Sequence, residues 1–349
     1  MAIADALNVR ARAPLRLGLA GGGTDLSPYC NEYGGNVLNA TIDRFAYAHM
    51  RTNRIGALVL RARDVGQEEV LEPSLDHPIN EGLVLHRAVY THMMRTYCDG
   101  VAVPLTMSTT IDVPAGSGLG ASSALVVALI EAFRYALQLP LGPYDVARLA
   151  FEIERVHIGL AGGRQDQYSA AFGGVNFLEF LPDDRVIVNP LRIRREHLNE
   201  FEASLVICFT GQSRQSESII KQQVAGLKQM DSATIAHMHE LKQDAIEMKL
   251  ALLRGDIRRT ADILGHSWAA KKATAAGVTN DVVNELYDAA MAAGAWAGKV
   301  SGAGGGGFLM FLTDPENSYQ LIQALNEAGG KASSVKFTYE GAEGWPISV

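Results

Sequence analysis

The chain has 349 residues, of which 48% are hydrophobic and 20% charged, and its formal net charge is -7. That is enough apolar material for a sizeable core, and the length favours two domains over one. The acidic balance disfavours a nucleic-acid partner, and three scattered cysteines do not suit a disulfide framework or a zinc site. No apolar run approaches the roughly 20 residues that span a bilayer, and the first ten residues show no secretion signal. We therefore expect a cytoplasmic protein without a membrane partner.

The first distinctive segment is APLRLGLAGGGTDLSP, residues 13–28. It ends in Thr24 and Asp25, whose hydrogen-bonding groups suit sugar hydroxyls. The plainer interpretation is a strand and turn with an Asp cap. Further on, residues 45–50 and 57–61 are strand-like, and LTMSTTID at 105–112 alternates as a half-buried strand.

PAGSGLGASSA at 114–124 then leads into the apolar run LVVALIEAF. Glycine lets a ligand approach the backbone closely, and serines before an apolar run indicate a helix start. A loop on a helix N-terminus is an anion site. A P-loop is excluded because no Gly-Lys-Ser/Thr follows. A dinucleotide fingerprint, an ATP-phosphate loop and a capped turn without a ligand remain open.

Helices are predicted over 122–137 and 143–157, the second with Pro143 in its first turn. The segment FEIERVHIGLAGGRQDQYSAAFGG at 151–174 contains Glu154 near a helix end and Asp166 between two glutamines. Either acid alone is more often a solvated or capping residue.

The second half of the sequence is also predicted to contain both strands and helices. Strands are predicted over 186–193, 204–209 and 308–312, and helices over 216–230, 235–253, 281–293 and 315–328. A second glycine-rich loop, KVSGAGGGGF at 299–308, runs directly into an apolar strand. This indicates that another group approaches the backbone of the loop closely. Several strands follow one another without a helix between them, which favours an α+β fold, with a domain boundary near 190–200.

Together these four segments resemble the GHMP kinase superfamily, which includes galactokinase, homoserine kinase and mevalonate kinase. PAGSGLGASSA is similar to its P-x-x-x-G-L-G-S-S-A phosphate loop, and KVSGAGGGG to its C-terminal glycine motif. The resemblance covers most of the chain. It implies a two-domain α+β fold with the active site in the cleft between a ribosomal-protein-S5-like domain (1–195) and a ferredoxin-like domain (196–349).

The resemblance also implies ATP as co-substrate and Mg²⁺ as metal. By position, Ser122 and Glu154 match the metal ligands, with Ser123 as the alternative because Ala121 replaces the first serine of the family pair. Asp166 matches the catalytic aspartate, and Arg16 matches the arginine beside it. ATP contacts are expected from Pro114, Gly116, Ser117, Gly118, Leu119, Gly120, Ala121, Ser122 and Ser123.

Within the family, the N-terminal stretch is similar to bacterial kinases of D-glycero-D-manno-heptose 7-phosphate, and L-fucose kinases share a related G-G-x-[ST]-D pattern. This implies phosphorylation of the anomeric hydroxyl to the 1,7-bisphosphate, a step toward nucleotide-activated heptose and surface polysaccharide. Arg214 is the candidate cation for the 7-phosphate. A nicotinamide-dependent oxidoreductase using Gly116–Ala121 and a homodimer stay open. Sugar contacts are expected from Arg16, Gly22, Gly23, Thr24, Asp25, Asp166, Arg214, Gly304 and Gly305.

Overall fold

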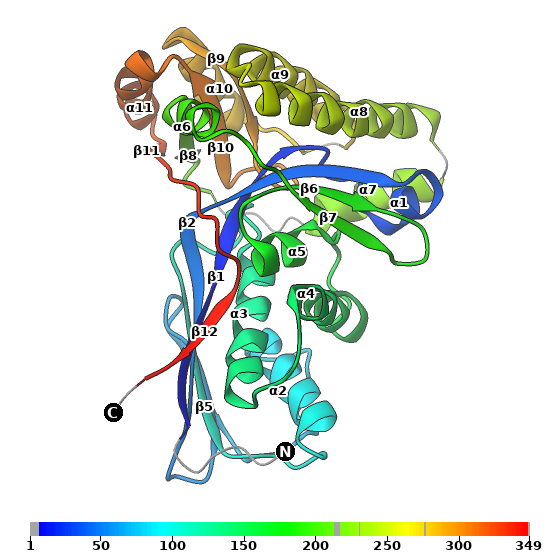
Figure 1. Cartoon of the computed structure of the whole chain (residues 1–349), viewed down its shortest axis with the longest axis vertical. Helices are drawn as coiled ribbons and strands as arrows, with labels where there is room; N and C mark the ends of the chain where they lie inside the picture. The colour runs from blue at the N-terminus through cyan, green and yellow to red at the C-terminus, as the bar shows by residue number, and fades with distance from the viewer. Residues whose placement is uncertain (1–6, 213–216, 230, 276, 348–349) are drawn as a thin grey trace.

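The structure is a computed structural model that describes residues 7–212, 217–229, 231–275 and 277–347. Two β-sheets, each packed against helices, make up the molecule (Figure 1). The first part of the chain forms β1 (Asn8–Ala20), α1 (Ser27–Tyr33), β2 (Gly35–Thr52), β3 (Leu58–Ala62), β4 (Gln67–Leu71), α2 (Val84–Tyr97), β5 (Leu105–Ile111), α3 (Ala121–Ala136), α4 (Pro143–Phe151), α5 (Gln165–Phe172), β6 (Val175–Phe180) and β7 (Val186–Pro190). The rest forms α6 (Arg195–Ala203), β8 (Leu205–Phe209), α7 (Glu217–Lys228), α8 (Ser232–Arg254), α9 (Ile257–Ala273), α10 (Asp281–Ala292), β9 (Ala295–Val300), β10 (Phe308–Thr313), α11 (Ser318–Glu327), β11 (Lys331–Ser334) and β12 (Glu343–Pro346).

The first sheet is organised around the long strand β2. Along most of its length β2 pairs antiparallel with β1, while its other edge pairs first with β6 and then with β5. The strand order is β12-β1-β2-β5-β3-β4, and β3 runs parallel to β5. Because most neighbours are antiparallel and the helices do not alternate regularly with the strands, the predicted α+β class is confirmed.

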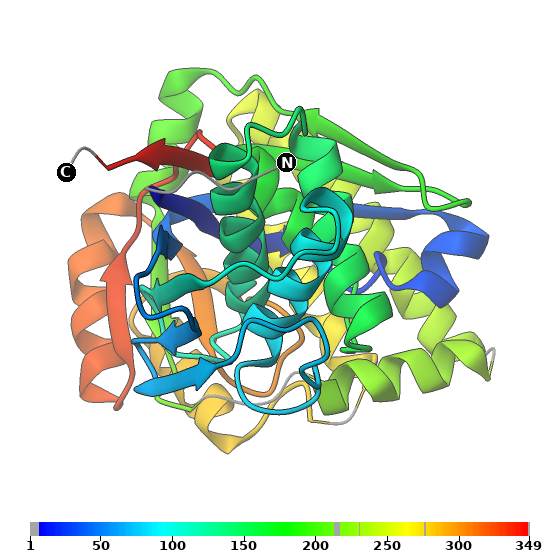
Figure 2. The ribbon, with the colours of Figure 1, turned by 90° about the horizontal axis from the view of Figure 1, so that it is seen from below.

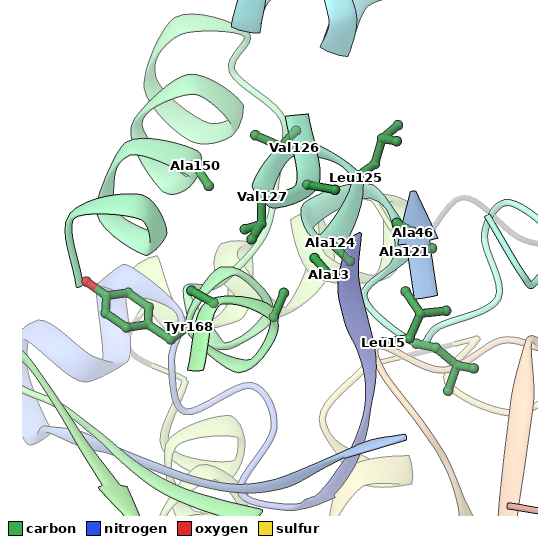
Figure 3. Close-up of a cluster of buried hydrophobic side chains, with 14 of the residues drawn as sticks. Ala13, Leu15, Ala46, Ala121, Ala124, Leu125, Val126, Val127, Ala150 and Tyr168 are labelled. Carbon is green, nitrogen blue, oxygen red and sulfur yellow. The ribbon is translucent and has the colours of Figure 1, made fainter. Parts of the chain in front are cut away.

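Helix α3 packs on β1 and β2, and this contact positions the loop that precedes the helix. Figure 3 shows small side chains where α3 meets the sheet, with Ala121 and Ala124 from α3, Ala13 from β1 and Ala46 from β2. Small residues let a helix approach a sheet closely. The Arg16 amide of β1 donates to the Leu119 carbonyl at 3.0 Å, so the glycine loop is held against this strand.

The second sheet has the order β11-β8-β10-β9 and is antiparallel throughout. After β11 the chain returns to the first sheet, where Phe337 bridges Ile42 and β12 pairs with β1. Figure 2 shows this red C-terminal strand beside the dark-blue β1. The main hydrophobic core includes residues of both sheets, so one apolar interior joins them.

The observed elements differ from the predicted ones at several points. The helix expected over 143–157 is α-helical only to Phe151, and residues Glu152–His157 form a π-helical turn. The segment 13–28 is strand β1 as far as Ala20, followed by a turn and the start of α1. Helix 315–328 begins with a 3₁₀ turn. The sequence did not predict helices α1, α2, α5, α6 and α9 or strands β4, β6, β9, β11 and β12.

Candidate active site

A cavity of about 510 Å³ lies where the two parts of the chain meet. On one side it is lined by the end of β1, the glycine loop before α3 and the segment 160–166. Residues of α7, α9 and the loop 302–303 line the other side. A cavity of this size, lined by backbone and a few convergent charged groups, is the expected form of a small-molecule site.

The loop 114–120 adopts a backbone that requires glycine. Gly116, Gly118 and Gly120 have φ values of 71°, 77° and 75°. At Gly120 an added Cβ would lie 3.2 Å from Cγ of Asp166, so this loop passes directly over the predicted catalytic aspartate. Because α3 begins at Ala121, the free amides of its first turn face the cavity and can bind an anion.

The second glycine-rich loop packs against the first. A Cβ at Gly302 would lie 2.6 Å from the Gly118 carbonyl oxygen, and a Cβ at Gly307 would lie 2.3 Å from the Ser117 carbonyl oxygen. The close approach inferred from sequence is therefore made to the neighbouring loop.

Two residues of this loop do not line the cavity, although sugar contacts were expected from them. Gly304 packs on the Val278 backbone, and the Gly305 amide donates to the Val278 carbonyl at 2.7 Å. Gly302 and Ala303 line the cavity in their place. Among the expected ATP contacts, Pro114 and Leu119 also do not line the cavity, and Leu119 belongs to the core.

Arg16 and Asp166 form an ion pair at the centre of the site. Asp166 Oδ1 accepts from Arg16 Nε at 2.8 Å and lies 2.7 Å from Nη2. The Arg16 guanidinium is nearly buried and also donates to the Gly118 carbonyl at 2.7 Å and to Ser301 Oγ at 3.2 Å. A guanidinium with this many partners is fixed in place, and it holds the carboxylate at the cavity wall.

Asp25 is buried, and four N–H groups surround its carboxylate. Oδ2 accepts from the Arg164 and Gln165 amides at 2.9 and 3.1 Å, and Oδ1 accepts from the Gly23 amide and from Gln165 Nε2, both at 3.1 Å. Asp25 thus anchors the start of α5, the helix that carries Asp166, and it also lines the cavity.

Thr24 cannot offer its hydroxyl to a sugar in this arrangement. It is fully buried, and its hydroxyl oxygen lies within hydrogen-bond distance of the Gly21 and Asn36 carbonyls, at 2.8 and 2.9 Å, and accepts from the Asn36 amide at 3.0 Å. The predicted sugar contact of Thr24 is therefore not retained, and the residue stabilises the turn instead. Gly22 does not line the cavity, whereas Gly23 does.

Ser122, in the first turn of α3, and Glu154 are joined by a hydrogen bond. The exposed Ser122 hydroxyl donates to Glu154 Oε1 at 2.7 Å, and Oε2 accepts from Gln167 Nε2 at 2.6 Å. Ser123 is buried and bonds the same Gln167. Glu154 belongs to the π-helical turn, a conformation that recurs at functional sites.

The donor set of Ser122 and Glu154 fits Mg²⁺, which takes one or two protein oxygens together with phosphate oxygens and water. The described residues contain no group of three or more His, Cys, Asp or Glu side chains arranged to hold a metal by themselves. A magnesium ion at this point would therefore depend on the nucleotide phosphates for its other ligands. Ser122 and Ser123 both line the cavity, whereas Glu154 is fully buried and reaches the site through its hydrogen bond with Ser122. The choice of Ser122 rather than Ser123 as the metal ligand stays a prediction.

Lys271 of α9 is a cavity residue that sequence reasoning missed. Its ammonium is buried, and Nζ lies 3.4 Å from the Gly22 carbonyl. Burial lowers the pKa of Lys271 to about 8; Arg16 also lowers it, while Asp25 and Asp166 raise it. The sequence does contain a signal: Lys271 follows Leu264 and Trp268 at helical spacing, which places a charge on an apolar helix face.

Two family models match the chain, described as the GHMP kinases N terminal domain, over residues 84–174, and GHMP kinases C terminal, over residues 248–331. D-glycero-alpha-D-manno-heptose 7-phosphate kinase of Campylobacter jejuni is 44% identical over 342 residues, which is 97% of this chain and 99% of the relative. This chain therefore belongs to the GHMP kinase family.

Two further proteins are also similar to this chain. The crystal structure of a D-glycero-D-manno-heptose 1-phosphate kinase from Bacteroides thetaiotaomicron has a TM-score of 0.83 at 42% identity, covering 98% of this chain and 100% of that one. A bifunctional fucokinase/GDP-fucose pyrophosphorylase of Arabidopsis thaliana is 28% identical over 91% of this chain but only 31% of its own length.

These similarities confirm the GHMP fold with its N- and C-terminal domains and the resemblance drawn from the motifs. The oxidoreductase alternative is wrong, because both family models describe kinases. Arg214 lies outside the described residues. No helix in the described part of the chain is both long and apolar enough to cross a membrane.

Proposed function

We propose that this protein transfers the γ-phosphate of ATP to the anomeric C1 hydroxyl of D-glycero-D-manno-heptose 7-phosphate, giving the 1,7-bisphosphate for nucleotide-activated heptose and surface polysaccharide. The observation that carries the chemistry is the Arg16–Asp166 pair, held at the cavity wall beneath the glycine loop. The acceptor assignment is supported by the Campylobacter relative, whose name is that of a heptose 7-phosphate kinase.

In this reaction the sugar oxygen forms a bond to the γ-phosphorus while the bond to the bridging oxygen breaks, and ADP leaves with the electron pair. Asp166 accepts the proton of the C1 hydroxyl. Arg16 stabilises the negative charge that develops on the transferred group. The amides of 116–123 and the α3 dipole hold the nucleotide phosphates.

Ser122 and Glu154 would hold Mg²⁺ beside the phosphates. The ion, when bound, supplies charge neutralisation of the phosphate oxygens. Glu154 also fixes the Ser122 hydroxyl through the hydrogen bond between them, and Gln167 orients Glu154 from behind.

The division into domains at 195/196 remains a proposal, as does action in the cytoplasm, where ATP is made. The three cysteines are buried and free, which suits a reducing compartment. Light scattering of the purified protein separates a monomer from a homodimer.

A kinase screen tests the function. The purified protein is assayed with ATP and Mg²⁺ against heptose 7-phosphate, L-fucose, galactose and mevalonate, with omission of Mg²⁺ as a control. We expect the highest kcat/KM on heptose 7-phosphate. A preference for L-fucose would favour the alternative that the Arabidopsis relative suggests. Phosphorylation of none of the four would contradict the proposal.

A further inference from the structure

The Lys271 ammonium lies in the cavity without a counterion of its own. No ion pair joins it to any acid within the described part of the chain, and its one hydrogen bond, to the Gly22 carbonyl, is long at 3.4 Å. An ammonium has three N–H groups to satisfy. A buried charge with so few partners is unfavourable unless a ligand completes its contacts.

The two nearest carboxylates are already occupied by other groups. Asp25 accepts four N–H groups, from the turn after β1 and from α5. Asp166 is paired with Arg16. The positive charge of Lys271 is therefore not neutralised locally, and an anionic ligand group would offset it better than a sugar hydroxyl would.

The position of Lys271 relative to the reacting groups points to the acceptor rather than to ATP. The glycine loop before α3 contacts Arg16 through Gly118 and Asp166 through Gly120. Gln165, next in the chain to Asp166, bonds Asp25.

A Cβ at Gly22 would lie 3.6 Å from both Gln165 Nε2 and Lys271 Nζ. Lys271 thus lies beside Gln165 and against the turn after β1, the segment from which sugar contacts were expected. Gln223 of α7 lines the same cavity and bonds Thr274, three residues after Lys271.

We propose that the Lys271 ammonium binds the phosphate group that the acceptor already carries, and so selects a phosphorylated sugar over the free sugar; this rests on the proposed function. The same phosphate chemistry is present in ATP, so the experiment must separate the two sources.

The test compares Lys271→Met with Lys272→Met. Lys272 is the neighbouring lysine on α9, but it is exposed and points toward Trp268, 5.6 Å from the ring centroid. Both variants lose one positive charge, so long-range electrostatic effects are matched. For each variant kcat and KM are measured with heptose 7-phosphate, with unphosphorylated heptose and with varied ATP, and circular dichroism and Tm establish folding.

For Lys271→Met we expect kcat/KM on heptose 7-phosphate to fall at least about 30-fold, mainly through KM, as for loss of a buried charge contact. Activity on unphosphorylated heptose and the KM for ATP should change less than about threefold, and Lys272→Met should behave as wild type. Equal losses on both sugars, or a raised KM for ATP, would overturn the proposal. So would a preference that survives Lys271→Met but disappears in Arg214→Ala.

The wild-type protein provides a second test that does not require a folded variant. The charged groups facing Lys271 are Arg16 of β1, Asp25 of the turn, Asp166 of α5 and Lys299 of β9. Phosphate binding needs the protonated ammonium, whose pKa is lowered to about 8 by burial.

The ratio of kcat/KM values for phosphorylated over free heptose should therefore fall as pH rises from 7 to 9.5, since kcat/KM reports the free enzyme. A flat ratio would contradict the proposal. A wild type that prefers the free sugar throughout would instead contradict the proposed function.

Discussion

Asp166 presents its carboxylate to the cavity with Oδ1 held by Arg16, and its side chain is 22% exposed. Asp166→Asn keeps the shape and an acceptor oxygen for Arg16 but removes the charge and the basicity. We expect kcat to fall roughly 100-fold or more, the usual scale for a positioned base, while ATP binding and the circular dichroism spectrum stay nearly unchanged. A variant with more than a tenth of wild-type turnover would remove Asp166 from this role.

The two serines at the start of α3 differ in exposure, and this difference predicts different effects. Ser122→Ala removes an exposed hydroxyl bonded to Glu154, and Glu154→Gln removes the charge of that pair. Both should weaken use of Mg²⁺-ATP, with partial recovery at higher Mg²⁺.

The control is Ser123→Ala, which removes a buried hydroxyl that accepts from Gln167. It should affect Tm more than the Mg²⁺ dependence of the rate. The opposite result, a silent Ser122→Ala and a Mg²⁺-dependent defect in Ser123→Ala, would show that the second serine binds the metal.

At the scale of elements, the two glycine loops depend on each other. Gly302 has φ of 80° and a Cβ there would lie 2.6 Å from the Gly118 carbonyl oxygen. Gly302→Ala therefore combines backbone strain with a clash against a backbone atom that cannot move freely. We expect a lower Tm and a KM for ATP raised at least about tenfold, because the displaced loop carries the phosphate amides.

Gly66→Ala is the matched control, because Gly66 has φ of 68° and open space around the added Cβ. The Gly66→Ala variant therefore carries only the strain of a positive φ, roughly 1 kcal/mol. Gly66 lies in the turn between β3 and β4. If both variants lose stability equally and bind ATP normally, the contact between the loops does not shape the nucleotide site.

Much of this arrangement could be predicted from local sequence. The strands near 105, 204 and 308 and the helices near 122, 235 and 281 follow from periodicity and from turn residues. The glycine loops and Asp166 were located by motif. The structural role of Thr24 could not be predicted from sequence, because the burial of its hydroxyl depends on the Asn36 carbonyl of β2. Lys271 was missed for a similar reason, since its place in the cavity depends on how α9 packs against the first sheet.

At the scale of the whole molecule, the two sheets share one apolar interior. Leu15 and Ile42 of the first sheet belong to the same buried cluster as Ile207 and Met310 of the second. The C-terminal segment also crosses between them, from β11 in one sheet to β12 in the other. We therefore expect the two parts to unfold as one cooperative unit.

The three tryptophans allow this to be measured. Trp296 lies in β9 of the second sheet, Trp268 lies in α9, which packs on β9, and Trp345 lies in β12 of the first sheet. Trp345→Phe leaves fluorescence that reports the second sheet, whereas the double change Trp268→Phe and Trp296→Phe leaves a reporter in the first.

In each variant, melting followed by fluorescence and by far-UV circular dichroism should give the same Tm, because unfolding of either sheet would expose the shared core of the other. The buried Trp268 makes the double variant less stable than wild type, so the comparison is made between probes within one variant. Two separated transitions within a single variant would show that the sheets unfold independently. The two proposed domains, divided at 195/196, would then each have their own Tm.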